Sequence, residues 1–200
     1  SYIKGSDKFP LGQNRWGFLP ITIQRFLKTN NKNCQISVTN NSLKRNHICI
    51  LRHGIELNRN QSFIGCIADI FIDTKTNIIP SIKEMKRNII ESINIDNFIT
   101  YQNGNLSQIF SNIDNDTMDR KDSIDIEKYK TSKLFKSVEN NVDDNKYKAF
   151  INIIKSYENF IKFLVSDKSY IDYTYLWDII CQPNDKLFKD GINLVILEMT

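Results

Sequence analysis

PITIQRFLKTN at Pro20–Asn30 and QSFIGCIADIF at Gln61–Phe71 decide the fold class, and they bracket a polar stretch that ends in CILRHGIELNR at Cys49–Arg59. The first begins with proline, which suits the opening position of a helix, and its apolar residues follow at intervals of three and four. The second repeats that spacing over Gln61–Ile72. Two helices are therefore predicted, and only short extended segments are expected between them.

Further along the chain the helical signals continue. Ser81 and Glu84 have the spacing of a capping box, and Asp144–Val165 has the apolar stripe of a long amphipathic helix. Tyr173–Cys181 continues the helical pattern, whereas Ile192–Met199 is a β-branched, apolar run that is typical of a buried strand. We therefore expect an α+β fold, mostly helical with a few short strands, including a buried strand near the C-terminus.

The charge and apolar patterns divide the chain into three parts. Residues 1–112 form a basic N-terminal part that contains the RWGFLP and LRHGIE blocks, and residues 113–128 are acidic without periodicity, which is typical of a linker or exposed loop. Residues 129–200 form a helical part that ends in the expected strand. Because the chain has no initiator Met and closes on an apolar run, it is interpreted as a fragment of a larger protein.

Positive charge is concentrated in the first 60 residues. They contain only two acidic residues, Asp7 and Glu56, whereas the whole chain has a formal net charge of +4. The basic residues in the same segment are Lys4, Lys8, Arg15, Arg25, Lys28, Lys32, Lys44, Arg45, Arg52 and Arg59. This segment therefore carries about +8 and the remainder about −4, an asymmetry that favours a surface for nucleic acid.

The compartment is predicted from apolar runs and cysteines. No apolar run approaches the roughly 20 residues that a membrane-spanning helix needs, so no membrane partner is expected. The four cysteines are widely spaced: Cys34, Cys49, Cys66 and Cys181. Two of them lie inside apolar segments, where cysteine behaves as a small apolar residue, and we expect a soluble, intracellular protein with reduced thiols.

The candidate ligands for a metal ion are Cys34, His47, Cys49 and His53, which have the spacing C-x12-H-x-C-x3-H. Structural zinc sites usually pair their ligands two to four residues apart at both ends, and Cys34 has no such neighbour. We therefore expect no metal, and interpret Cys49 as a buried thiol rather than a nucleophile.

Other catalytic signatures are weak. The seven glycines do not have the spacing of a phosphate-binding loop. Asp185, Asp190 and Glu198 resemble the acidic residues of metal-dependent nucleases, which leaves a degenerate nuclease-like domain as a remote alternative. The sequence therefore predicts a protein that is not an enzyme, with no catalytic residues and no cofactor.

Candidate nucleic-acid contacts come from cationic side chains in predicted loops and element ends, where they can reach a phosphate backbone. These candidates are Arg15, Lys44, Arg45, Arg52, His53 and Arg59, with Trp16 as a stacking partner. Two alternatives stay open: Arg52 can instead fix a loop through carbonyl groups or pair with Glu56, and Trp16 can instead belong to the core.

Four blocks of the chain resemble a known family. They are YIKGSDKFPLGQNRWGFLPITIQRFL from Tyr2, CILRHGIELNRNQSFIGCIADIF from Cys49, TYQNGNLSQIF from Thr100 and YTYLWDIICQPNDKLFKDGINLVILEM from Tyr173. This wording resembles the large subunit of the early transcription factor of nucleocytoplasmic large DNA viruses, in its mimivirus-like version, and more loosely that of poxviruses.

The resemblance implies a non-catalytic domain of a viral early transcription initiation factor, a DNA-binding protein of promoter recognition and early gene expression. The partners it implies are viral early promoter DNA, the viral RNA polymerase and the small ATPase/helicase subunit of the same factor. It implies a location in the virion core and in the viral factory of the host cytoplasm. The alternative is a protein-interaction module that docks on the polymerase or helicase subunit without direct DNA contact.

Overall fold

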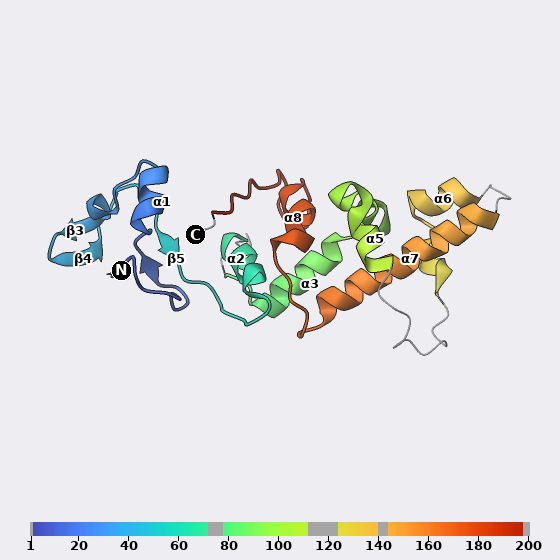
Figure 1. Ribbon diagram of the computed structural model, residues 1–200, viewed down its shortest axis with the longest axis horizontal. Helices are drawn as coiled ribbons and strands as arrows, with labels where there is room; N and C mark the ends of the chain where they lie inside the picture. The colour runs from blue at the N-terminus through green and yellow to red at the C-terminus, as the bar shows by residue number, and fades with distance from the viewer. Residues whose placement is uncertain (1, 72–77, 112–123, 140–143, 198–200) are drawn as a thin grey trace.

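The computed structural model describes residues 2–71, 78–111, 124–139 and 144–197. The molecule is elongated: an N-terminal part that holds all the strands of the described residues lies at one end, and α6 and the start of α7 lie at the other (Figure 1). We call residues 2–59 the N-terminal module and the described residues from 60 onward the helical body. The predicted class, α+β and mostly helical with a few short strands, is confirmed.

The described strands are short and form two small sheets in the N-terminal module. The first has the order β1-β2-β5, with β1 (Ile3–Lys4) parallel to β2 (Trp16–Gly17) and β2 antiparallel to β5 (Arg52–His53). The second is an antiparallel hairpin of β3 (Gln35–Ser37) and β4 (Asn40–Leu43). Such short ladders have little stability of their own, so other contacts must hold the module together.

Helices make up most of the described remainder. The module contains α1 (Ile21–Phe26) and the 3-10 helix η1 (Asn31–Cys34). The body contains α2 (Ser62–Ile70), α3 (Ile82–Ser92), α4 (Ile95–Phe98), η2 (Tyr101–Gly104), α5 (Asn105–Ser111), η4 (Ile126–Tyr129), α6 (Lys133–Glu139), α7 (Asp144–Val165) and α8 (Tyr173–Cys181).

Local sequence signals account for the best-predicted helices. The long helix predicted at Asp144–Val165 has those bounds in the structure. The predicted capping box is also present, because Ser81 Oγ accepts a hydrogen bond from Glu84 N (3.3 Å) while Ser81 N donates to Glu84 Oε2 (2.8 Å). Such a box satisfies two backbone donors that the first turn of a helix leaves unpaired.

The helical body has a large apolar core to which most of its described helices contribute. Its buried side chains include Ile64 of α2, Ile89 of α3, Phe110 of α5, Phe160 of α7 and Ile179 of α8. The predicted acidic segment 113–128 lies between two of these contributors, and its residues 113–123 fall outside the described part of the chain. Residues on both sides of the segment therefore pack into one core.

A second, smaller core lies where α6 packs on α7. Phe135 of α6 and Phe150 and Ile154 of α7 are buried there together with Ile95 of α4. Tyr157 of α7 packs against both cores. A 22-residue helix extends about 33 Å, so α7 is long enough to serve the two cores along one face.

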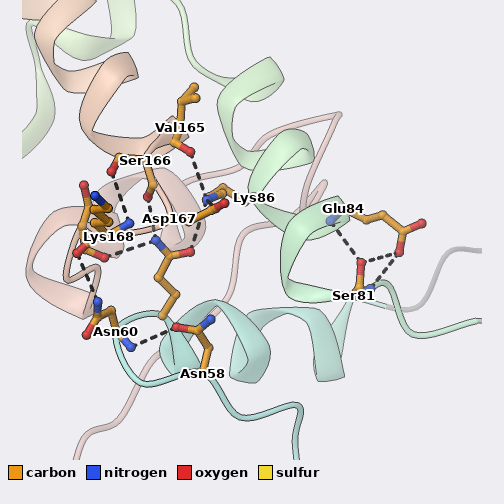
Figure 2. Close-up of polar contacts among 11 residues, drawn as sticks. Asn58, Asn60, Ser81, Glu84, Lys86, Val165, Ser166, Asp167 and Lys168 are labelled. Atoms are coloured by element: carbon orange, nitrogen blue, oxygen red, sulfur yellow. Dashed lines mark hydrogen bonds and ion pairs between the residues drawn. The ribbon is translucent and has the colours of Figure 1, made fainter.

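A buried lysine fastens α2 and α3 to the end of α7 (Figure 2). Lys86 Nζ donates to Gln61 Oε1 (3.2 Å), to the carbonyl of Val165 (3.2 Å) and to Asp167 Oδ1 (2.5 Å). Gln61 Nε2 in turn donates to the carbonyl of Ser166 (2.8 Å). Because an ammonium group has three protons to place, this arrangement satisfies a charge that would otherwise be costly to bury.

The predicted buried strand near the C-terminus is wrong. Residues 192–197 form no strand with any described segment, and Val195 is 75% exposed. An apolar, β-branched run becomes a strand only when a partner completes its hydrogen-bond ladder, and the described part of the chain supplies none. The last residues of the predicted strand, 198–199, lie outside the described residues.

The first predicted helix forms as α1, but the apolar side chains of its stripe are not buried. None of its residues is buried, and Phe26 is 68% exposed. The helix ends after six residues, and Leu27 beyond it is also exposed. Helical spacing identifies a face with apolar side chains, whereas only the tertiary arrangement decides whether a neighbour covers that face.

Candidate nucleic-acid interface

Arg52 on β5 is the hub of the N-terminal module. Its Nε donates to the carbonyl of Phe18 (2.7 Å), Nη1 to the carbonyl of Lys8 (2.9 Å) and Nη2 to the carbonyl of Gly5 (2.9 Å). The guanidinium also lies over the ring of Phe9, 4.0 Å from its centroid. Burial lowers the pKa of Arg52. Arginine side chains nevertheless stay protonated in proteins.

These bonds correspond to the loop-fixing role that the sequence left open for Arg52. The other alternative, a pair with Glu56, is not formed, because Glu56 Oε2 instead accepts a hydrogen bond from the backbone N–H of Ile82 (2.8 Å). A guanidinium that is bonded to three backbone carbonyls is poorly placed to turn outward toward a phosphate. We therefore leave Arg52 out of the interface proposed below.

A disulfide links η1 to the segment that precedes β5. Cys34 and Cys49 are bonded to each other with a Cα–Cα distance of 5.8 Å and a sequence separation of 15. The interpretation of Cys49 as a reduced, buried thiol is therefore wrong. Beside the disulfide, Lys44 N donates to the carbonyl of Cys34 (2.8 Å) where the β3-β4 hairpin ends.

Asn31, which is uncharged, also links separate segments of the module through hydrogen bonds. Its Oδ1 accepts from Leu19 N (2.6 Å) and its Nδ2 donates to the carbonyl of Ile50 (2.9 Å), while its backbone N–H donates to Gln24 Oε1 (2.9 Å). Asn31 is almost fully buried. A buried amide with its donors and acceptor satisfied fixes three segments that have no strand pairing between them.

His53 and Trp16 form the joint between the module and the helical body. His53 Nδ1 lies 2.8 Å from both carboxylate oxygens of Asp69 on α2. The Trp16 ring lies against the His53 ring with their centroids 4.3 Å apart, as expected of facing residues in the β2-β5 pair. The structure thus engages both predicted contact residues in internal packing, and Trp16 remains partly exposed.

The remaining cations of the module all reach solvent. Nine are exposed: Lys4, Lys8, Arg15, Arg25, Lys28, Lys32, Lys44, Arg45 and Arg59. Within the described residues only Lys8 of this set has an ion pair, with Asp7 at 3.9 Å and on the surface. We call these nine residues the cationic set. Its charges are free to attract counter-ions or a polyanion, because exposed carboxylates hardly oppose them.

The predicted candidates fall in different places within this set. Lys44 and Arg45 directly follow β4, at the hairpin, whereas Arg15 precedes β2 in the other sheet and Arg59 lies just before α2. Arg15 is held by its backbone, since its carbonyl accepts from Gly54 N (2.8 Å). Lys44 and Arg45 are neighbours in the chain itself, and the structure distributes the other candidates along the module.

A groove lies between α1, η1 and the β3-β4 hairpin. It has a volume of about 960 Å³, and its lining includes Phe18, Ile21 and Ile36 together with Lys32 and His47. Lys32 and His47 were not among the predicted site residues. No local signal identifies them, because they are brought to one groove by the disulfide and by Asn31 rather than by sequence spacing.

Metal and nuclease chemistry find no support in the described residues. Among those residues no group of three or more histidine, cysteine, aspartate and glutamate side chains could hold a metal ion. Asp185 and Asp190, the acids of the remote nuclease alternative, are both exposed, and Glu198 lies outside the described part. No described helix is long and apolar enough to cross a membrane.

Comparison of the chain with protein-family models, with curated proteins and with solved structures found no match. The function proposed below therefore depends on the geometry and charge of the N-terminal module and on the wording of the four sequence blocks.

Proposed function

We propose that the N-terminal module is a non-catalytic surface that contacts the phosphate backbone of DNA. The observation that carries the proposal is the cationic set: nine exposed lysines and arginines accompany one exposed carboxylate, Asp7, in 58 described residues from 2 to 59. A surface of this kind attracts a polyanion from a distance and releases the counter-ions bound to it, which supplies affinity without reading sequence.

The module is built to present these charges on a firm support. Arg52, Asn31 and the disulfide between Cys34 and Cys49 fix the backbone from inside, so that the exposed side chains extend from a shape with little freedom. Rigid presentation lowers the ordering entropy that phosphate contacts would otherwise cost. The predicted contacts that remain in the proposal are Arg15, Lys44, Arg45 and Arg59, whereas Arg52, His53 and Trp16 support them.

The resemblance to viral early transcription factors gives this surface a biological setting. Under this proposal the chain is a domain of an initiation factor that contacts early promoter DNA in the virion core or the viral factory. RNA polymerase and the helicase subunit are its proposed protein partners. The support for this setting is the wording of the sequence blocks, and the support for a polyanion is the charge of the module.

Fluorescence anisotropy with a labelled 20-base-pair duplex tests the DNA contact. If about four phosphates are neutralised, the logarithm of affinity should fall with the logarithm of salt concentration at a slope of about −3.6. Replacement of Arg15, Arg45 and Arg59 by Glu should then flatten that slope to about −0.9.

A matched control changes the net charge by the same amount on the helical body. Lys146, Lys148 and Lys155 of α7 are exposed, and their replacement by Glu should leave the slope near that of the unmodified chain. Absence of binding at 20 mM salt, or equal losses in the two triple variants, would show that the cationic set is only a solvated surface.

The second candidate, a protein-docking module without DNA contact, has one observation in its favour. The helical body exposes Tyr147 and Trp177 on α7 and α8, with Tyr170 between these helices, and aromatic side chains are enriched in protein interfaces. Co-purification with RNA polymerase after the change of Arg15, Arg45 and Arg59 to Glu separates the two functions. A retained complex with unchanged DNA affinity favours this second candidate.

A further inference from the structure

The β3 strand of the hairpin has an edge that nothing in the described structure covers. Its sheet has two strands, so β4 pairs with one side of β3 and the other side has no strand partner among the described residues. Gln35, Ile36 and Ser37, the three residues of β3, all line the groove described above, so the strand borders it along its whole length. Unpaired N–H and C=O groups along an edge are a template for another extended chain.

The groove beside that edge offers apolar surface from both walls. Ile21 of α1 is 61% exposed, Ile36 of β3 is 57% exposed and Val38 beyond it is 91% exposed. Three large aliphatic side chains exposed around one hollow are more than the scattered single residues that soluble surfaces usually carry. An occupant with its own apolar side chains would remove this surface from water.

The charge of the groove is of one sign. Lys32 and Lys44 line it together with His47, and no aspartate or glutamate is among its described lining residues. Neither lysine has an ion pair with any described carboxylate. An occupant with carboxylates at intervals would therefore meet uncompensated positive charge on entering.

The chemistry of the lining favours a polypeptide over a nucleic acid strand. Proteins that bind single strands stack successive bases on aromatic rings, whereas Phe18 and His47 are the ring side chains of this groove and its large exposed residues are aliphatic. A strand edge, by contrast, recognises the main chain of a peptide, and alternate side chains then enter the flanking pockets.

We propose that the β3 edge binds an extended, acidic segment of a partner protein as an added strand. Alternate apolar side chains of that segment pack on Ile21, Ile36 and Val38, and its carboxylates face Lys32 and Lys44. The inference shares Lys32 and Lys44 with the cationic set, but it depends on an unpaired edge and an apolar lining. Arg15, Arg45 and Arg59, the residues changed in the DNA test, do not line the groove.

Methyl NMR on the full 200-residue chain provides the test. The probe is a synthetic nine-residue peptide in which Asp or Glu alternates with Val or Leu, titrated into protein labelled at isoleucine and valine methyl groups. The methyl signals of Ile21, Ile36 and Val38 should shift together, while Ile48, which is exposed outside the groove, should not. A three-residue edge makes few main-chain bonds, so we expect a Kd between about 10 µM and 1 mM.

Control peptides separate strand addition from other modes of binding. A peptide with Lys in place of every acidic residue should bind at least tenfold more weakly, and the variant with Lys32→Glu and Lys44→Glu should reverse that preference. Two further peptides are N-methylated at alternate backbone amides, one at the odd positions and the other at the even positions. One of them should lose binding and the other should keep it, because only the N–H groups along one edge of an added strand can donate to β3.

Three results would overturn the proposal. The first is the absence of groove shifts at 2 mM peptide. The second is equal binding of the two N-methylated peptides, which would exclude strand addition. The third is a larger shift with an oligothymidine of nine bases than with the acidic peptide, which would assign the groove to nucleic acid. Duplex binding by the variants of Arg15, Arg45 and Arg59 is measured separately, so failure of one proposal leaves the other standing.

Discussion

Replacement of Arg52 by methionine removes the hub of the N-terminal module while keeping most of the side-chain volume. The change deletes three hydrogen bonds from a charged donor to the carbonyls of Gly5, Lys8 and Phe18, and the interaction of the guanidinium with the ring of Phe9. The Gly5–Lys8 turn and the residue that follows β2, Phe18, then lose their common donor.

The size of the effect follows from these contacts. A hydrogen bond that involves a charged group stabilises a protein by about 1.5–3 kcal/mol, but water can replace part of it here because Arg52 is partly exposed and the bonds are not additive. We therefore expect the free energy of unfolding of the module to fall by about 2–4 kcal/mol. Arg52→Lys should fall between this variant and the unmodified chain, since an ammonium cannot reach three carbonyls in the guanidinium geometry.

Native-state hydrogen exchange measures this loss where it occurs. The amides of Asn14 and Phe18 are bonded to the carbonyls of Gly54 and Lys4, so they exchange only when the module opens. A loss of 2–4 kcal/mol corresponds to exchange that is roughly 30- to 700-fold faster at these amides. Arg59→Met is the control, because Arg59 is exposed and should change stability by no more than about 0.5 kcal/mol.

The opposite result would refute the structural role of Arg52. If Arg52→Met leaves the exchange of these amides within a factor of two of Arg59→Met, the three carbonyl bonds contribute nothing that water does not supply. A loss of DNA affinity without any change in exchange would then return Arg52 to the contact surface, as the sequence first predicted.

Reduction of the bond between Cys34 and Cys49 should destabilise the module by about 3 kcal/mol, seen as a lower urea midpoint with reductant, because the open chain gains the freedom of a 15-residue loop. Lys86→Met should cost about 1–3 kcal/mol in urea denaturation, since buried acceptors lose their donor; Asp167→Asn should cost less, because that carboxylate is exposed. The bond from Lys86 lowers the pKa of Asp167, so its contribution is lost as pH falls through that lowered value. Burial raises the pKa of Tyr101 to about 12, so stability present below pH 10 is lost as pH rises from 10 toward 12, and Tyr101→Phe should remove this component of base denaturation followed by circular dichroism.

The helices of the body were predictable because their signals are local. In α7 the apolar side chains recur at helical spacing over 22 residues, so errors at single positions average out. In α3 the capping box needs only the identities of Ser81 and Glu84, and both partners are three residues apart. Such features depend only on residues that are close in the sequence, and not on the tertiary arrangement of the rest of the chain.

The role of Arg52 was open because its partners have no sequence signature. Its acceptors are backbone carbonyls 34, 44 and 47 residues away, and every residue type has a carbonyl. Charge counting treats each arginine alike, so it could not separate this internal cation from Arg15 or Arg59, which are exposed. Only the pairing of β2 with β5 brings the acceptors within reach.

The errors at Cys49 and at the C-terminus share a physical cause. Residue type gave the tendency correctly, since cysteine favours burial and β-branched residues favour strands. Whether Cys49 forms a disulfide and whether residues 192–197 form a strand depends on a partner segment elsewhere in the chain. The fold places Cys34 beside Cys49, whereas no described strand pairs with residues 192–197. Neither event can be derived from spacing along the chain.

The shared helix α7 links the two cores of the helical body. Phe150 and Ile154 belong to the smaller core, Phe160 and Leu164 belong to the larger one, and Tyr157 contacts both. Loss of packing in one core therefore removes support from the same helix that the other core packs against. A defect at the α6 end therefore lowers the protection of amides near α8, far from the site of the damage.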